Sequence, residues 1–338
     1  MSLFIIISIF LLFGALIPTR SQGGYLFVSF IVLFILMAYR DTSVGTDTVN
    51  YETIFLYLQL GSDWLRGSVE PSFVILNDLV SSLGGDFIAF LITSSLLILI
   101  LIFYAARRYS YNPMLTIFLY YSLYFYFYAF NILRQSIAVA ISLIAINYLI
   151  KQKHILYCLL ILLAASFHYS ALVMLPLLLV SRLPINKALM IALVFFAMAL
   201  GLFGTPIFLK TISLIGYGSY VNEYEIGSFF GNFLNLILFN LFFTYIVLTI
   251  NHKNIYLQLF FLFIVLFNLT ARIPFGNRLL LYLSIYQILF IPYYLGHIRD
   301  PKKYKIISII FIVILSYFTF FRVFGAGEII PYTNTLLQ

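Results

Sequence analysis

Arg134 has the clearest chemical potential in the sequence, because it stands near the start of an apolar stretch, in Asn-Ile-Leu-Arg-Gln-Ser from Asn131 to Ser136. If Asn131 is the N-cap, Arg134 occupies the third helical position, at the positive end of the helix macrodipole. A cation there favours a bound anion. A phosphate would find free backbone N–H groups beside a guanidinium that can bind it at two points. The alternative is an arginine paired with lipid headgroups or with a nearby acid.

Two further arginines, Arg272 and Arg278, flank Ile-Pro-Phe-Gly-Asn between two apolar stretches. Pro274 and Gly276 interrupt the helix there, so a turn can direct both guanidinium groups at one pocket. A loop with two arginines and no acid suits a diphosphate, although two separate interfacial anchors are the structural alternative. Arg40 would complete a ring of four arginines at one membrane edge.

His168 lies in the middle of a long apolar stretch. Histidine accepts protons near neutral pH, so this side chain is a candidate general base for a sugar hydroxyl. Asp47 and Glu70 are the carboxylate alternatives, and either could instead hold an acceptor hydroxyl or pair with Arg40. A hydrogen-bonded packing role for His168 remains the plain structural alternative.

Metal and nucleotide chemistry have little support. No second His or Cys stands near His168 in the sequence, which disfavours zinc, and Glu223 and Glu225 in Glu-Tyr-Glu are more typical of a solvated loop than of a metal site. The chain has no Gly-rich phosphate loop and no G-x-S-x-G motif. We therefore expect no cofactor and no metal.

The elements that must position these residues cross a membrane. The 338 residues are 63% hydrophobic and only 9% charged, whereas a soluble domain has about 25% charged residues. The low charge extends along nearly the whole length, so neither a soluble enzyme nor a nucleic-acid binder fits. The formal net charge of +8 is typical of cytoplasmic loops beside anionic lipid.

Apolar stretches long enough to cross about 30 Å of hydrocarbon predict an all-α polytopic protein with about 10 to 12 transmembrane helices in one integral domain, residues 1–338. The stretch 155–180 is too long for one straight helix, so we expect a short hairpin or re-entrant pair with His168 near its outer turn. The other candidate spans are 3–17, 25–39, 87–106, 114–130, 132–150, 188–203, 233–250, 255–271, 279–295 and 306–321.

The distribution of Lys and Arg predicts which loops are cytoplasmic. It leaves two polar segments on the outer face, residues 40–86 and 205–232, and within the first the part 71–83 is amphipathic enough to lie in the membrane interface. A dense aromatic run between Tyr120 and Phe130 is typical of an interfacial belt, with stacking on sugar rings as the alternative.

Four local patterns resemble the polytopic polysaccharide polymerases of the EpsG-like and Wzy type. The patterns are Tyr39-Arg40-Asp41 followed by Gly45-Thr46-Asp47 and Tyr51; Glu70-Pro71 before an amphipathic segment; Asn131 to Ala138; and Phe167 to Ala171. They cover about the first 180 residues in order, and the C-terminal part matches more loosely through Arg272 and Arg278.

The resemblance implies a glycosyltransferase that acts at the periplasmic face of the bacterial inner membrane, with a GT-C-like arrangement as one option. An oligosaccharide repeat unit on undecaprenyl diphosphate would receive the growing chain from a second carrier lipid, with undecaprenyl diphosphate as leaving group and no metal. The product would be O-antigen, capsule or exopolysaccharide, and a chain-length regulator would be a possible protein partner. The diphosphate would bind Arg134, Arg272, Arg278 and Arg40, and Tyr51 and Gln135 would contact sugar.

Two functions from other classes remain open. A flippase of lipid-linked oligosaccharides would also be polytopic, basic and rich in aromatic residues, but transporters commonly have related halves and polar groups near the membrane midplane. A membrane acyltransferase that modifies glycans would use His168 but would not need several outer arginines.

Overall fold

The computed structural model describes residues 2–180, 185–204, 210, 229–249, 255–271, 276–298, 300, 302, 307, 329 and 332–335. Every named element among these residues is helical, which confirms the all-α fold. The chain divides into two compact units. The first comprises Met1–Leu172 with Gln287–Gln338, and the second comprises Val173–Tyr286. Each unit is described by itself, and the single membrane domain stays a prediction.

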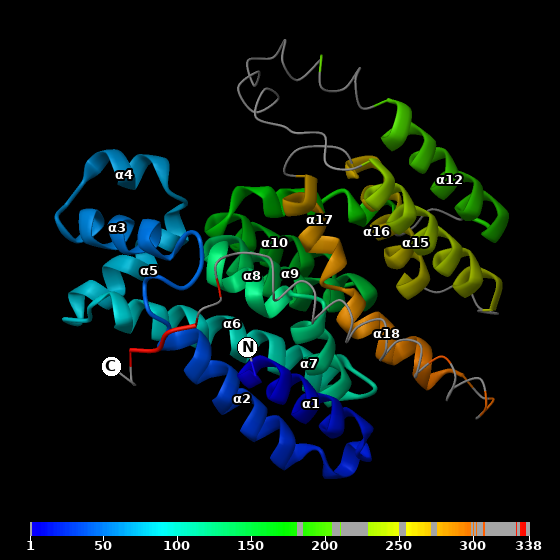
Figure 1. The fold of residues 1–338 in the computed structure, drawn as a ribbon. Coiled ribbons are helices and arrows are strands. Elements are labelled where there is room, and N and C mark those ends of the chain that lie inside the picture. Colours follow the sequence, from blue (N-terminus) through cyan, green and yellow to red (C-terminus); the bar gives the residue numbers. More distant parts are fainter. Residues whose placement is uncertain are drawn as a thin grey trace. The chain divides into compact units, whose positions relative to one another are not determined.

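The first unit contains the site residues of the N-terminal half. Its labelled helices can be followed in Figure 1. Its helices are α1 (Ser2–Leu16), η1 (Thr19–Ser21), α2 (Gly23–Ala38), α3 (Thr48–Gln59), α4 (Asp63–Ser68), α5 (Pro71–Ser82), α6 (Phe87–Tyr109), α7 (Pro113–Ser122), α8 (Phe125–Asn131), α9 (Leu133–Ile150), α10 (His154–Phe167) and α18 (Gln287–Gly296). The polar segment 40–86 therefore folds into three short helices, α3 to α5, between the longer helices α2 and α6.

Local sequence signals set where several helices begin. The Asp86 carboxylate accepts a hydrogen bond from the backbone N–H of Ala89 at 2.9 Å and caps α6. Asn112 caps α7 in the same way, and Pro113 occupies the first helical position, where its missing N–H costs nothing. Pro71 likewise begins α5.

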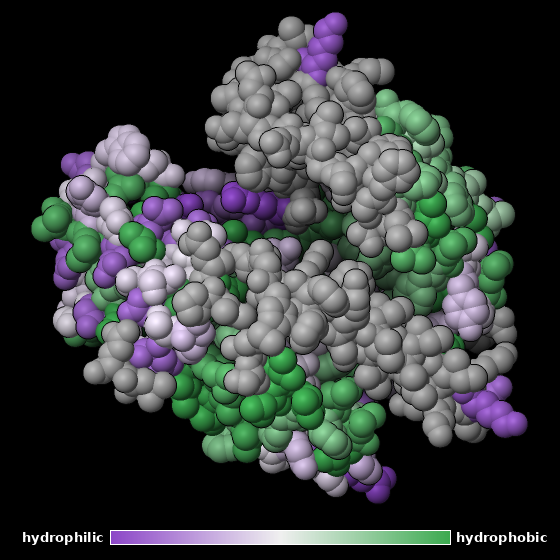
Figure 2. Space-filling model, viewed as in Figure 1, coloured by the Kyte–Doolittle hydropathy of each residue, from purple (hydrophilic) through white to green (hydrophobic). Residues whose placement is uncertain are grey.

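The helices confirm a polytopic membrane protein. Three in the described ranges are long and apolar enough to cross a membrane: Phe87–Tyr109, Leu133–Ile150 and Arg278–Gly296. Shorter apolar helices of 10–17 residues accompany them, among them α1 and α2. Apolar surface covers the region of α1 and α2, whereas the α3 to α5 segment has a mixed surface with many polar residues (Figure 2).

Two expected spans are interrupted. The stretch 114–130 is not one helix, because α7 ends at Ser122 and Tyr124 adopts a left-handed backbone conformation with φ of 73° before α8. A bulky residue rarely adopts this conformation unless its surroundings enforce it, so propensity did not reveal the break. The stretch 279–295 contains only a two-residue turn, at 285–286, between α17 and α18, and Arg278–Gly296 taken as one segment is still long and apolar enough to cross a membrane.

The helix end expected near His168 is confirmed, whereas the short hairpin or re-entrant pair over 155–180 stays a prediction. Helix α10 ends at Phe167, and a short 3-10 helix, η2 (Tyr169–Met174), follows directly.

The aromatic run from Tyr120 to Phe130 is inside the first unit. All its aromatic side chains except Tyr128 are buried, and the hydroxyls of Tyr121 and Tyr126 donate to backbone carbonyls of α1 and α2 at 2.8 and 2.9 Å. For the buried rings, the prediction of an interfacial belt and the alternative of sugar stacking are therefore both wrong, because these rings face the protein interior. The run packs the centre of the unit.

The second unit contains α11 (Leu177–Val180), α12 (Lys187–Phe203), α15 (Phe229–Thr249), α16 (Ile255–Thr270) and α17 (Gly276–Ser284). Its centre is polar at one point, because Asn240 of α15 and Asn268 of α16 are fully buried and exchange two side-chain hydrogen bonds of 3.1 and 2.8 Å. Asn268 also donates to the carbonyl of Val194 in α12. This pair joins three apolar helices. The predicted outer segment 205–232 and the last expected span, 306–321, lie almost entirely outside the described residues.

Candidate active site

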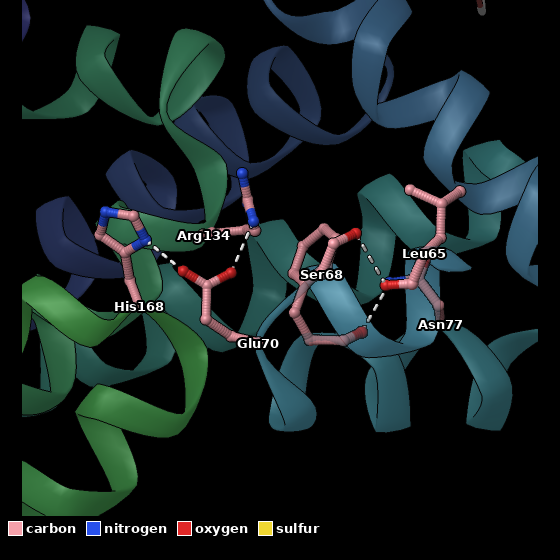
Figure 3. Close-up of polar contacts among 7 residues, drawn as sticks. Leu65, Ser68, Glu70, Asn77, Arg134 and His168 are labelled. Carbon is pink, nitrogen blue, oxygen red and sulfur yellow. Dashed lines mark hydrogen bonds and ion pairs between the residues drawn. The ribbon is translucent and has the colours of Figure 1, made fainter. Parts of the chain in front are cut away.

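Glu70 is the buried centre of an ionic cluster. It is the N-cap residue of α5, but its side chain does not bond to the helix that it precedes, and that side chain is only 6% exposed. One carboxylate oxygen, Oε2, lies 2.5 Å from Nη1 of Arg134, and the other, Oε1, lies 2.7 Å from Nδ1 of His168 (Figure 3). We call Glu70, Arg134 and His168 the ionic cluster.

The charge state of Glu70 follows from its partners. Burial raises the pKa of Glu70, but the hydrogen bond with His168 and the charge of Arg134 lower it more, so the net pKa lies below the ordinary value. An ionised carboxylate only accepts hydrogen bonds. His168 must then donate through Nδ1. In the neutral ring, Nε2 is the nitrogen that can accept a proton, and the side chain is 25% exposed.

Arg134 lies at the start of α9, but not as the sequence suggested. The N-cap is Ile132, so Arg134 is the second helical residue, and Asn131 ends α8. The prediction of Asn131 as N-cap is wrong. Its side-chain oxygen accepts a hydrogen bond from the backbone N–H of Thr46, 85 residues earlier in the chain, at 2.8 Å. Arg134 still stands in the first turn, where a carboxylate relieves the unfavourable helix electrostatics.

The guanidinium of Arg134 contacts Glu70 and Phe73 and is still partly accessible to solvent. It lies over the ring of Phe73, 5.7 Å from the ring centroid, and the side chain is 27% exposed. Its Nε is buried and, within the described part of the chain, has no hydrogen-bond partner. A guanidinium with one side bound to Glu70 and part of its surface open can still meet an anion.

Tyr51 and Asp47, two further predicted site residues, lie near Arg134. It is buried in α3, its ring packs 5.9 Å from that of Phe73, and burial raises its pKa. A hydrogen bond with Arg134 and the charge of this arginine act in the opposite direction, and the nearby charge of Asp47 raises the pKa further. Asp47, half-buried, precedes α3 and makes no capping bond. Both residues therefore border the ionic cluster.

Arg40 is not on an open surface. It is 1% exposed, follows α2, and donates through Nη1 to the carbonyl of Met37 at 2.7 Å. Its guanidinium lies 5.0 Å from the centroid of the Phe130 ring. Burial lowers its pKa to about 10, which leaves it charged at neutral pH. Within the described residues it has no ion pair with Glu70, because that carboxylate is bound to Arg134 and His168.

The remaining predicted residues are more scattered. Gln135 is buried in α9, next to Arg134 in sequence. Arg278 is exposed in α17 of the second unit, and Arg272 lies outside the described residues, as do Glu223 and Glu225. A diphosphate role for Arg272 and Arg278 stays a prediction.

The four sequence patterns meet in the first unit. Glu70 contacts Arg134 of the third pattern and His168 of the fourth, and the first pattern packs on the third through Thr46 and Asn131. Phe73, whose ring lies under the guanidinium of Arg134, was not predicted from the sequence. An apolar residue in an amphipathic helix does not stand out from its neighbours.

Among the residues that the structure describes, no group of three or more His, Cys, Asp or Glu side chains could hold a metal ion. The expectation of a metal-independent protein stays a prediction.

Fold and site together define a polytopic α-helical membrane protein with a Glu–Arg–His cluster centred on the buried Glu70 of its polar segment. A family model described as the EpsG family matches residues 24–334, and the chain belongs to this family. No curated protein and no solved structure matches the sequence.

Family membership indicates a membrane polysaccharide polymerase type of function and, at a coarse level, a glycosyltransferase-like enzyme. The match extends over both units, whereas the sequence patterns were clearest in the first 180 or so residues.

Proposed function

We propose that the protein is a Wzy-type polymerase of the bacterial inner membrane that joins lipid-linked oligosaccharide repeat units at the periplasmic face. The donor and acceptor glycans are carried by undecaprenyl diphosphate. The observation that carries the proposal is the ionic cluster: a candidate base and an anion-binding guanidinium are held by the same buried carboxylate.

In the proposed reaction, a hydroxyl of the acceptor glycan attacks the anomeric carbon of the donor chain. A new carbon–oxygen bond forms, the proton passes to Nε2 of His168, and the bond to the diphosphate oxygen breaks with its electron pair. Base assistance of this kind contributes about 10² to 10⁴-fold. The diphosphate-linked sugar is already activated, so no nucleotide sugar is needed.

Arg134 takes the leaving group in this proposal. Charge develops on the diphosphate as the bond breaks, and a preorganised cation near it stabilises the transition state more than the ground state. The partly exposed guanidinium supports this role. Tyr51, Asp47 and Gln135, which border Arg134 in space or in sequence, are the proposed neighbours of the sugar.

Glu70 orients both functional groups. Its acceptor-only carboxylate fixes the ring of His168 with Nδ1 protonated, and its second oxygen fixes the direction of Arg134. We therefore propose Glu70 as a positioning residue, with direct catalysis by this carboxylate or by Asp47 as the alternative if His168 is dispensable.

The test is glycan length on a gel from a deletion strain complemented with wild type or His168→Ala. The proposal expects a ladder with wild type and a single repeat unit with the variant at equal protein level in the membrane. A near-normal ladder with His168→Ala moves the base to a carboxylate.

The deletion strain itself separates the function classes. Loss of a polymerase leaves single repeat units on the lipid acceptor, loss of a flippase leaves almost none, and loss of an acyltransferase leaves a full ladder that lacks a substituent. A full ladder without the protein would overturn the polymerase proposal.

A further inference from the structure

The C-terminal residues Tyr332–Thr335 pair with the segment that leads from α2 to the site. They lie antiparallel to Tyr39–Asp41, with Arg40 opposite Asn334 in an isolated β-bridge. Two backbone hydrogen bonds of 3.2 and 2.9 Å join the two segments. In Figure 1 the C-terminal segment, drawn in red, passes beside the end of α2.

Side chains strengthen this pairing. The hydroxyls of Ser43 and Thr333 lie 3.1 Å apart, and the hydroxyl of Tyr332 donates to the carbonyl of Leu36 at 2.8 Å. This carbonyl belongs to the last turn of α2, where carbonyls have no partner within the helix. The Tyr332 ring also packs edge-on against Phe4, at 5.7 Å between centroids. The C-terminal segment is thus fixed at several independent points.

Arg40 lies beneath this pairing, and its contacts are all internal. Besides Met37 and Phe130, it contacts Thr48, whose hydroxyl oxygen lies 3.4 Å from Nε. Its Nη2 is buried and, among the described residues, has no hydrogen-bond partner. The Arg40 side chain is 1% exposed, and Tyr332 of the C-terminal segment lies close enough to act on its charge, so an anion could reach this guanidinium only if the packing around it opened.

Thr48 links Arg40 to the helices that hold the ionic cluster. Its hydroxyl lies 2.6 Å from the carbonyl of Val44 and 3.3 Å from that of Phe130, just before α9. Thr48 is also the first residue of α3, one turn before Tyr51, which contacts Arg134. The contacts therefore form a continuous series from the C-terminal segment through Arg40 and Thr48 to Arg134.

We propose that Arg40 is a positioning residue for Arg134, and that Tyr332–Thr335 form a permanent clamp that closes over it. The competing assignment is Arg40 as a direct ligand of the diphosphate, which would require the clamp to open. The effect on catalysis rests on the proposed polymerase function, but the clamp itself does not.

The first test compares Thr48→Val with Thr48→Ser. Valine has nearly the shape of threonine but no hydroxyl, whereas serine keeps the hydroxyl. The inference expects repeat-unit polymerisation by purified protein to be about tenfold slower in Thr48→Val, the size of one buried hydrogen bond, and near normal in Thr48→Ser. A Thr48→Val protein as active as wild type would overturn the positioning series, and normal activity of Thr48→Ser would assign the loss to the missing hydroxyl.

The second test fixes the clamp covalently. Ser43→Cys and Thr333→Cys are combined in a Cys158→Ala background, which removes the single natural cysteine, and Ser43→Cys alone in that background is the control. The inference expects an intramolecular disulfide under mild oxidation, with activity within about twofold of the reduced protein. Failure to form the disulfide would contradict the pairing of the clamp with Tyr39–Ser43. Loss of activity that a reductant restores would show that the clamp must open, in favour of Arg40 as a diphosphate ligand.

Failure of this inference differs from failure of the proposed function. If wild type makes no polymer, the polymerase proposal falls, and disulfide yield still decides for or against the clamp. If wild type polymerises but either test gives the contrary result, only the inference falls.

Discussion

At the scale of single residues, the carboxylate of Glu70 binds two partners at once, one through each oxygen. Its carboxylate is nearly sealed from solvent, so its charge is tolerable only because Arg134 and His168 bind it directly. Removal of one partner leaves a buried charge with a single contact, and such losses are larger than the value of the pair itself. Substitutions here therefore test both stability and activity.

Arg134→Lys is expected to lose most polymerisation, close to the loss in Arg134→Ala. A lysine ammonium is a point charge and cannot bind Glu70 with one edge while it presents another edge to a diphosphate. The measurement is glycan length on a gel, at membrane protein levels matched by immunoblot. A normal ladder with the lysine variant would mean that charge alone suffices.

The ionic cluster should weaken in acid. The folded pKa of Glu70 is lowered, so its contribution to stability is complete above the ordinary carboxyl range and disappears as pH falls through the folded pKa. Thermal unfolding of detergent-purified wild type and Glu70→Gln should thus differ clearly at about pH 7, and the difference should shrink as pH falls below the ordinary carboxyl range. A difference that does not change with pH would contradict the assigned charge state.

At the scale of elements, the segment between α2 and α3 must approach α8 very closely, and Gly45 permits this. Its φ is +93°, and a Cβ there would lie 2.7 Å from the carbonyl oxygen of Phe130 and 2.8 Å from the side-chain oxygen of Asn131. The glycine is required both by its backbone conformation and by space. It allows the first sequence pattern to dock on the third.

Gly45→Ala should therefore displace the segment between α2 and α3 from α8 and greatly reduce polymerisation, with a loss of stability of roughly 1–3 kcal/mol. Gly67→Ala is the matched control, because nothing lies within 4 Å of its Cβ position and it has no positive φ. Glycan ladders and melting temperatures of both variants give the comparison. If the two alanine variants had the same ladder and the same melting temperature, the close backbone approach at Gly45 would not require a glycine.

At the scale of the whole molecule, packed aromatic rings contribute to both units. The second unit has in addition a pair of hydrogen-bonded asparagines among its apolar helices. Inter-helix hydrogen bonds in apolar surroundings contribute about 0.6 to 2 kcal/mol each. Close helix approach must add to them, and Gly201 shows such an approach, since a Cβ there would lie 1.9 Å from the carbonyl oxygen of Asn268.

Gly201→Ala is expected to separate α12 from α16 and to lower the melting temperature of the protein by several degrees, as an overpacking loss of roughly 1–3 kcal/mol implies. The matched control is Gly24→Ala in α2, where a Cβ meets nothing within 4 Å. Protease resistance of α15 and α16 in membranes is the second measurement. Unchanged melting of Gly201→Ala would mean that the helices can shift at little cost.

The sequence by itself determined the membrane class, most helix bounds and the identity of the cluster residues. Apolar length and helix caps are local properties, so stretches such as 87–106 and the break at His168 could be predicted directly. Arg134 and His168 were evident because ionisable groups in apolar surroundings are rare, whereas Glu70 was one of two carboxylate candidates, with Asp47, in the polar segment 40–86. These signals depend on neighbours a few residues apart.

Only the tertiary structure decided which of these residues bind one another. Glu70 pairs with Arg134 and His168, 64 and 98 residues away, and not with the nearer Arg40. The left-handed Tyr124, the buried aromatic run and the pairing of Tyr332–Thr335 with Arg40 have no local signature. The physical reason is that such contacts arise from packing between distant elements, whose net energy is a small difference between burial and hydrogen bonding summed over the whole fold.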